Sequence, residues 1–302
     1  MASPFSRRSF LGKTAVTATI ASTAASLHHR LQAAEEKGAL KGRINHSVCK
    51  WCYPKVGLKE FCEASKEIGL TSIDLLQPAD METLKPFGLT CAMISNPETD
   101  GPNGKKIGGI SRAWNRVEHH DKLVEAYEAQ IDAAAKLGLS NVICFSGNRD
   151  GQDDEVGLQN CAKGLKRLMK RAEEKKVVLT MELLNSKVNH PDYQCDHTSW
   201  GVALCKLIGS DHFKLLYDIY HMQIMEGDVI ATIRSSHPYI SHYHTGGVPG
   251  RNEIDESQEL YYPAIMEAVV ATGFKGFVAQ EFIPKREDVI ASLQQGVEIC
   301  DI

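Results

Sequence analysis

The sequence lacks three features that would each indicate a particular class of protein. The first expected strand, 44–51, is not followed by the Gly-rich phosphate turn of an open dinucleotide-binding sheet. No second Cys-x-x-Cys motif completes a zinc site with Cys49 and Cys52. Internal repeats and low-complexity tracts are absent past the N-terminal stretch. An open dinucleotide-binding sheet and a paired zinc motif are therefore the lesser alternatives.

An excess of positive charge is also missing. The 302 residues hold 34 Lys and Arg against 38 Asp and Glu, which gives a formal net charge of −4. A protein without a broad basic surface is not expected to take a nucleic-acid backbone as its main partner, although a local basic groove stays open. The composition, 43% hydrophobic and 24% charged, is ordinary for a soluble globular protein. The length allows one large domain. The sequence leaves open whether the protein forms a homo-oligomer.

The N-terminal stretch differs from the rest of the chain. Arg7 and Arg8 form a twin arginine followed by Phe-Leu, and the uncharged segment 14–25 comes next. This pattern is typical of a twin-arginine export signal, and a disordered basic tail is the other interpretation. The apolar part is too short and too weakly apolar for a stable membrane span. We therefore expect residues 1–33 to be a cleaved signal that places the domain 34–302 in the periplasm.

Nine cysteines are an odd number, so they cannot all pair within one chain. The motif Cys49-Lys50-Trp51-Cys52 could be a redox pair or half of a zinc site, but it ends a strand instead of beginning a helix. Five others lie on apolar faces of expected helices or within strands and are interpreted as small core residues: Cys62, Cys91, Cys144, Cys161 and Cys205. The sequence does not select a disulfide.

Expected strands and helices alternate regularly after the signal. The expected strands are 44–51, 71–76, 90–95, 141–146, 177–183, 213–218, 240–244 and 277–282. The expected helices are 58–68, 81–86, 116–137, 156–175, 199–208, 228–235, 262–272 and 286–300, with Gly69 and Gly138 as helix stops. Eight strand-helix pairs without a break in composition predict a single closed α/β barrel, a (β/α)8 TIM barrel.

Four of the expected strands end in ionisable side chains: Glu182, Asp218, His244 and Glu281. Their separations are 36, 26 and 37 residues, close to the roughly 31-residue repeat of a (β/α)8 barrel. Alternate residues of a strand share a face, so each of the four shares a face with the residue two positions before it. If these faces line the barrel axis, all four side chains are expected to point toward one volume. Three crowded carboxylates would repel one another unless one is protonated or a cation lies between them. The set suits one divalent ion, Mg²⁺ or Mn²⁺ first, with Co²⁺ and Zn²⁺ as further candidates.

The chemistry that such a site favours is the isomerisation of an α-hydroxy carbonyl compound. A metal chelated by the hydroxyl and carbonyl oxygens would stabilise the enediolate that forms when a C–H proton leaves. Glu182 and Glu281 are the candidates for base and acid. His221 could position a substrate oxygen, or it could bond to a neighbouring loop. Arg251 could grip a carboxylate or hydroxyl, or it could form a surface salt bridge with Glu253 or Asp255.

Four segments carry a family resemblance. They are Met-Glu-Leu-Leu-Asn at 181–185, Tyr-Asp-Ile-Tyr-His-Met-Gln at 217–223, Val-Pro-Gly-Arg-Asn-Glu at 248–253 and Gln-Glu-Phe at 280–282. From about Ile44 onward the chain resembles the hydroxypyruvate isomerase family, one of the xylose isomerase-like barrels. The resemblance implies metal ligands at Glu182, Asp218, His244 and Glu281, with the two glutamates exchanging protons. It also implies that His221 and Arg251 hold the substrate.

Two departures from this family leave the substrate open. The family commonly has Gln where His244 stands, and His is reminiscent of its ketose 3-epimerase relatives; an export signal is also unexpected for a cytoplasmic isomerase. A small sugar is thus as good a substrate candidate as hydroxypyruvate, which would give tartronate semialdehyde. An endonuclease IV-like phosphodiesterase and a sugar-binding module are the rival classes. Loop residues Asn185 and His190 could border the pocket or be solvated.

Overall fold

The computed structural model describes residues 39–302, without the side chain of Asn103. The expected export signal lies outside the described residues and stays a prediction. No helix in the described part is long and apolar enough to cross a membrane. All nine cysteines fall within the described range, where each is buried and free.

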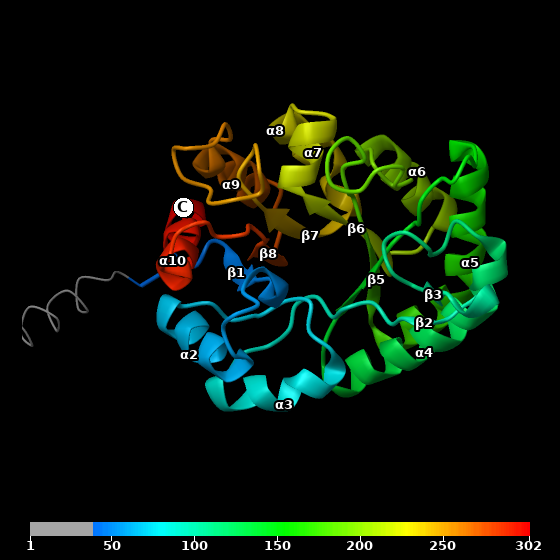
Figure 1. The fold of residues 1–302 in the computed structure, drawn as a ribbon, viewed down its shortest axis with the longest axis horizontal. Coiled ribbons are helices and arrows are strands. Elements are labelled where there is room, and N and C mark those ends of the chain that lie inside the picture. Colours follow the sequence, from blue (N-terminus) through cyan, green and yellow to red (C-terminus); the bar gives the residue numbers. More distant parts are fainter. Residues whose placement is uncertain (1–38) are drawn as a thin grey trace, which may run out of the picture. The chain divides into compact units, whose positions relative to one another are not determined.

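Residues 41–302 form a parallel sheet that curls into a barrel inside a ring of helices (Figure 1). The sheet consists of β1 (Asn45–Val48), β4 (Asn141–Cys144), β5 (Val178–Glu182), β6 (Phe213–Asp218), β7 (Ile240–Thr245) and β8 (Phe277–Gln280), paired in the order β1-β8-β7-β6-β5-β4. The helices are α2 (Leu58–Ile68), α3 (Met81–Leu84), α4 (His120–Lys136), α5 (Asp154–Lys175), α6 (Thr198–Ile208), α7 (Ile219–Met225), α8 (Val229–Ser236), α9 (Tyr262–Ala271) and α10 (Val289–Cys300). The predicted TIM barrel is confirmed.

The barrel is closed between β1 and β4 by two segments that are not continuous strands. Single parallel bridges join Cys49 to Asp74, Ser72 to Thr90, and Ile94 to Val142. The strands expected at 71–76 and 90–95 are therefore in place, but their pairing is interrupted. Leu75 has a φ of 60°, a left-handed conformation that an extended strand cannot contain and that is uncommon outside glycine. The conformation of Leu75 interrupts the first of these two segments, 71–76.

Helix boundaries agree with the sequence prediction where capping residues mark them. Gly69 ends α2 with a φ of 98°, and its N–H donates to the carbonyl of Lys66. Asp153 precedes α5, and its carboxylate accepts the N–H groups of Glu155 and Val156. Two elements were missed. Helix α7 begins directly after β6, and the segment between the expected strand 90–95 and the expected helix 116–137 contains the short hairpin of β2 (Thr99–Asp100) and β3 (Lys106–Ile107).

The pairing of β6 with β7 sets the geometry of the site. Asp218, the last residue of β6, lies opposite His244 in β7, so their side chains project from adjacent positions on one face of the sheet. Glu182 ends β5 on one side of this pair, and Glu281 directly follows β8 on the other. The carboxyl ends of four consecutive strands thus deliver the four ionisable groups to one end of the barrel.

Candidate active site

The four side chains predicted to converge do lie together. One ligand atom from each of Glu182, Asp218, His244 and Glu281 falls within 4.8 Å of the others. All four residues are buried, with at most 5% of their surface exposed. Acidic and imidazole groups withdrawn from water in this way need partners of opposite charge or strong hydrogen bonds.

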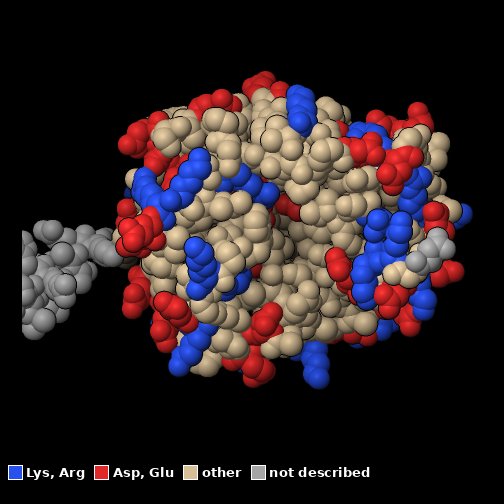
Figure 2. All heavy atoms as spheres, in the orientation of Figure 1, with Lys and Arg blue, Asp and Glu red and all other residues tan. Residues whose placement is uncertain are grey.

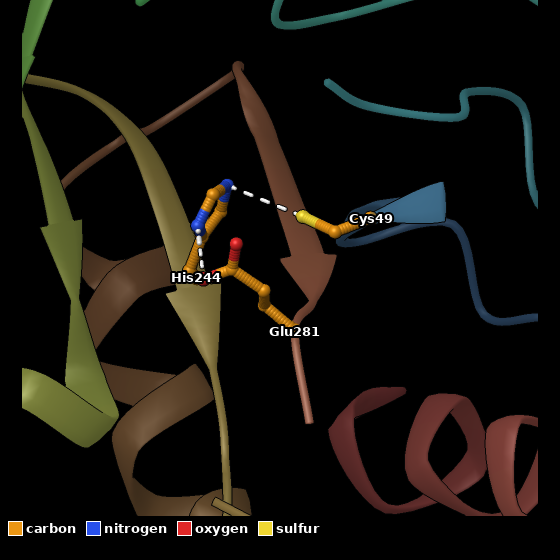
Figure 3. Close-up of side chains that lie close together, drawn as sticks. All are labelled: Cys49, His244 and Glu281. Carbon is orange, nitrogen blue, oxygen red and sulfur yellow. Dashed lines mark hydrogen bonds and ion pairs between the residues drawn. The ribbon is translucent and has the colours of Figure 1, made fainter. Parts of the chain in front are cut away.

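His244 is the hub of the cluster. Its Nδ1 lies 2.8 Å from Glu281 Oε2 and 3.4 Å from Glu182 Oε1 (Figure 3). Figure 3 shows the imidazole between the ends of two neighbouring strands, with its second nitrogen directed away from the carboxylate. Nδ1 therefore faces the carboxylates of Glu281 and Glu182, and Nε2 faces Cys49 in another part of the barrel.

The three carboxyl groups differ in their affinity for protons. Burial raises the pKa of Asp218 to about 8, although Arg251 opposes this shift. Burial also raises the pKa of Glu182. Burial would do the same at Glu281, but the charges of His244 and Arg251 hold its pKa well below the ordinary value. The crowded acids therefore do not all favour ionisation, as expected for carboxylates that share one small volume.

Arg251 lies inside the site and not on the surface. Its Nη2 donates to Glu281 and lies 3.3 Å from Asp218 Oδ2, and only 8% of the residue is exposed. The guanidinium carbon lies 5.1 Å from the ring centre of Trp51 and 5.4 Å from that of Tyr220. The alternative of a surface salt bridge to Glu253 or Asp255 is wrong.

Those two acids have other partners. Glu253 accepts the backbone N–H groups of Lys285 and Arg286 and the hydroxyl of Ser292, and Asp255 pairs with the Arg286 guanidinium. The loop after β7 is thereby tied to the loop after β8. This tie holds Arg251, which has a φ of 58°, over the carboxylates.

His221 lies on the first turn of α7 and faces the cluster. The Asp218 carboxylate caps this helix by accepting the N–H of His221 at 3.0 Å. The imidazole Nδ1 accepts the backbone N–H of Asn185 at 3.1 Å, so Nε2 carries the proton. Burial lowers the pKa of His221 well below its ordinary value, which makes the ring neutral. Nε2 has no hydrogen-bond partner among the described residues and lies 3.6 Å from Asp218 Oδ2.

Asn185 and His190 both border the site, although His190 remains partly exposed. Asn185 is fully buried, and its side-chain nitrogen lies 2.6 Å from His221 Nδ1. The His190 ring centre lies 5.3 Å from that of His221. Asn185 is a polar residue three positions after the candidate ligand Glu182. This closeness in the sequence could have marked it as a residue of the pocket.

Other contributors come from the first part of the barrel, and sequence reasoning missed them. Cys49 Sγ lies 3.6 Å from His244 Nε2, and the Trp51 indole N–H donates to Glu281 Oε1 at 2.8 Å. The imidazole of His242 lies 2.6 Å from Asp74 Oδ2, with both side chains fully buried. Each contact joins residues more than 160 positions apart, so no local pattern announces it.

The Asp74–His242 pair forms a polar layer beneath the cluster. Ser47 and Ser72 donate their hydroxyls to Asp74 Oδ1 at 2.6 and 3.1 Å. Burial opposes the charge of Asp74, but His242 and Ser47 hold its pKa below the ordinary value. The His242 ring meets the His244 ring edge-on, with the centres 5.2 Å apart.

The surface view shows how the barrel opens to solvent. In Figure 2 the face turned to the viewer is hollowed near its centre, and acidic and basic atoms lie beside the hollow. An α/β barrel whose strand ends carry three carboxylates, an imidazole and a buried arginine belongs to the class that does its chemistry at one end of the barrel.

Comparisons with known proteins identify the family. Residues 62–299 match the family model described as "Xylose isomerase-like TIM barrel". The match spans well over half of the chain, so the protein belongs to this family. A Homo sapiens relative named "Putative hydroxypyruvate isomerase" is 24% identical over 251 residues, which cover 79% of this chain and 89% of that protein.

Solved structures share the fold at low sequence identity. The "AP endonuclease, family 2 from Brucella melitensis" superposes with a TM-score of 0.73 at 22% identity, over 83% of this chain and 97% of that one. The D-psicose 3-epimerase from Clostridium cellulolyticum H10 superposes with a TM-score of 0.68 at 16% identity, over 85% and 98% of the two chains. At these identities the likeness shows the barrel fold alone.

Proposed function

We propose that this protein is a divalent-metal-dependent isomerase of the hydroxypyruvate isomerase type. It would interconvert an α-hydroxy aldehyde and the corresponding ketone, with hydroxypyruvate or a related small sugar as substrate. The observation that carries the proposal is the convergence of Glu182, Asp218, His244 and Glu281 within 4.8 Å. The human relative's name and the family membership support it.

The cluster fits one divalent cation. Three carboxylate oxygens and one imidazole nitrogen are donors suited to Mg²⁺ or Mn²⁺, with Co²⁺ and Zn²⁺ also compatible. Glu182 Oε1 is buried and has no hydrogen-bond partner among the described residues, as expected for an atom that awaits a cation. When bound, the ion would supply positive charge beside the substrate oxygens and stabilise the negative charge that develops as the proton leaves.

Glu182 and Glu281 are the residues that we assign to proton transfer. They follow strands on opposite sides of the β6–β7 pair, so they flank the volume in front of Asp218 and His244. One carboxylate would take the C–H proton from one carbon, and a carboxyl group would return it to the neighbouring carbon.

Two further groups would hold the substrate. The Nε2–H of His221 is a buried donor without a partner among the described residues, so a substrate oxygen would satisfy it. The Arg251 guanidinium, flanked by Trp51 and Tyr220, could bind a carboxylate or hydroxyl with two parallel hydrogen bonds. A neutral imidazole and a fixed cation together would orient a hydroxy-carbonyl compound in front of the glutamates.

A ketose 3-epimerase is the second candidate. The observation that favours it is His244, which stands where hydroxypyruvate isomerases commonly have Gln. Epimerisation would use the same two glutamates on opposite faces of one carbon, so the site residues are unchanged. An endonuclease IV-like phosphodiesterase would need several zinc ions. Among the described residues the groups able to hold a metal overlap in His244, which favours a single ion.

The decisive experiment is proton exchange in deuterated water. The purified protein with added Mn²⁺ or Mg²⁺ is incubated with hydroxypyruvate and with simple ketoses, and solvent deuterium at the reacting carbon is followed by NMR. Glu182→Gln and Glu281→Gln are expected to abolish the exchange, and the surface variant Glu267→Gln is expected to retain it. Absence of exchange into every hydroxy-carbonyl compound would reject the isomerase and favour a sugar-binding module. A metal content of three ions per chain would favour the nuclease.

A further inference from the structure

The Cys-x-x-Cys segment after β1 has both cysteines buried and free, and it touches the site at two points. Residues 49–52 leave β1 and turn through a short 3-10 helix, Lys50–Cys52. Cys49 contacts His244 from this segment, and Trp51 contacts Glu281. We name residues 49–52 the β1 turn. Both of the groups that it contacts are candidate metal ligands.

The contact between Cys49 and His244 does not make a nucleophile. A cysteine, an imidazole and a carboxylate in a row have the order found in thiol hydrolases (Figure 3). Cys49 has no exposed surface, and burial together with the charges of Glu281 and Asp74 raises the pKa of its thiol well above the ordinary value. A buried neutral thiol that solvent does not reach is not an attacking group.

The same contact can decide which nitrogen of His244 carries the proton. An imidazole that binds a cation through Nδ1 must hold its proton on Nε2, and it usually donates that proton to a carboxylate, a carbonyl or water. Nδ1 of His244 faces the carboxylates, and Nε2 lies 3.6 Å from Cys49 Sγ. The sulfur therefore stands where a metal-binding histidine has its outer hydrogen-bond acceptor.

Trp51 contacts the other candidate ligand, Glu281, through its indole nitrogen. Its indole N–H donates to Glu281 Oε1, which leaves Oε2 directed at His244 Nδ1. The ring is 43% exposed and covers the Arg251 guanidinium, whose carbon lies 5.1 Å from the ring centre. An aromatic side chain that stays partly exposed while donating to a buried carboxylate fixes the rotation of that carboxylate.

We infer that the β1 turn is a positioning segment for the metal site. Nδ1 of His244 donates to Glu281 here, and when a cation takes the place of that proton, Cys49 would accept the proton that stays on Nε2, while Trp51 fixes which oxygen of Glu281 faces the cation. This inference rests on the proposed metal-dependent function, because both residues act on side chains that are proposed to bind the metal. Neither residue is a catalytic residue, since each acts through the ligand that it contacts.

The test measures metal affinity and does not depend on turnover. The dissociation constant of Mn²⁺ is determined by electron paramagnetic resonance for the unsubstituted protein and for Trp51→Phe, Cys49→Ala and Cys49→Ser. Trp51→Phe removes the N–H but keeps a ring over Arg251, and Cys49→Ser keeps an acceptor beside Nε2. We expect about tenfold weaker binding for Trp51→Phe and for Cys49→Ala, because outer partners of metal ligands typically contribute that much. Cys49→Ser should bind like the unsubstituted protein.

Matched controls separate positioning from stability. Cys144→Ala changes a fully buried cysteine at the end of β4, and Trp200→Phe removes an indole N–H that donates to the carbonyl of Asp154. Both controls should leave the Mn²⁺ affinity unchanged. The nitrogen chemical shifts of His244 in Mg²⁺-loaded protein should report a proton on Nε2, and Cys49→Ala should give a mixture of tautomers.

Three results would overturn the inference. Unchanged Mn²⁺ affinity in both Trp51→Phe and Cys49→Ala would show that the contacts do nothing for the ligands. Equal weakening in the two controls would show a general loss of stability. A parent protein that takes up no Mn²⁺ would remove the metal site and the inference with it. If the expected affinity pattern appears but no deuterium enters hydroxypyruvate or any of the ketoses, the proposed reaction fails and the positioning role stands.

Discussion

The two halves of the barrel are built differently. The ligand half, residues 178–281, contains four strands that pair over several residues each, with one bulge between β6 and β7 at Leu215 and Leu216, and each strand delivers a candidate ligand at its carboxyl end. The supporting half, residues 45–144, has short strands joined by single bridges, with Leu75 in a left-handed conformation. It provides the β1 turn, which contacts the candidate ligands His244 and Glu281, and the Asp74 carboxylate, which contacts His242 below them. The paired strands of the ligand half carry the candidate ligands, and the supporting half contributes side chains that contact these ligands.

The largest effect is expected from a substitution in the ligand half that leaves the fold intact. Glu182→Gln preserves the shape of a buried side chain but removes its ability to move a proton. We expect kcat for hydroxypyruvate, or for the accepted ketose, to fall by about 10²- to 10⁴-fold. Circular dichroism and urea unfolding should show a native protein. Activity within tenfold of the parent would mean that Glu182 transfers no proton.

The next largest effect is expected on stability and comes from the supporting half. Burial lowers the pKa of His242 and keeps the imidazole neutral, so Asp74→Asn replaces the charged partner of a buried neutral ring, and a hydrogen bond to a charged group contributes about 1.5–3 kcal/mol. Urea unfolding of the metal-free protein should show this loss. The control is Asp132→Asn, which breaks an exposed pair with Arg171 and should cost less than about 1 kcal/mol. A stable but inactive Asp74→Asn protein would instead make Asp74 part of the reactive site and erase the distinction between the halves.

A smaller effect on turnover is expected at the junction of strand and helix. His221→Phe removes the Nε2–H donor that we assign to a substrate oxygen, so kcat/KM should fall by about 10²- to 10³-fold. His221→Gln restores a donor at a similar distance from the backbone and should recover part of the loss. Steady-state kinetics of both variants give the comparison. Equal loss in both would indicate that His221 only packs against the loop of Asn185.

The smallest effect is expected in helix α5, which lies between the two halves in the sequence and belongs to the outer ring of helices. Asp153→Ala removes the carboxylate that caps α5, and loss of such a cap costs about 1 kcal/mol. Urea unfolding should detect this change, while kcat and the Mn²⁺ affinity should stay the same. A change in metal affinity would show that this helix transmits strain to the strand ends and that the site is less independent than its geometry indicates.

The ligand half could be predicted from the sequence because two local signals coincide there. Apolar runs that end in an ionisable residue define buried strands, and the spacing of Glu182, Asp218, His244 and Glu281 matches the barrel repeat. Alternation within each strand then fixes the side on which each group projects. The convergence of these side chains follows from periodicity alone.

The supporting contacts could not be predicted, because they depend on closure of the barrel. Cys49 and His244 are 195 residues apart, and Trp51 and Glu281 are 230 apart. Arg251 lies in a loop whose path is set by hydrogen bonds to the following loop, so its sequence neighbours suggested a surface pair that does not exist. The break at Leu75 is likewise a backbone conformation that a β-type sequence does not reveal.

Asp218 occupies a position with a consequence for how this protein can evolve. One oxygen of its carboxylate starts α7 by accepting the N–H of His221, and the other faces the reactive cluster. A lineage that dropped this acid would lose, in one step, the start of the helix and the placement of the imidazole on it. Descendants could therefore exchange substrates by changing loops much more readily than they could abandon this aspartate.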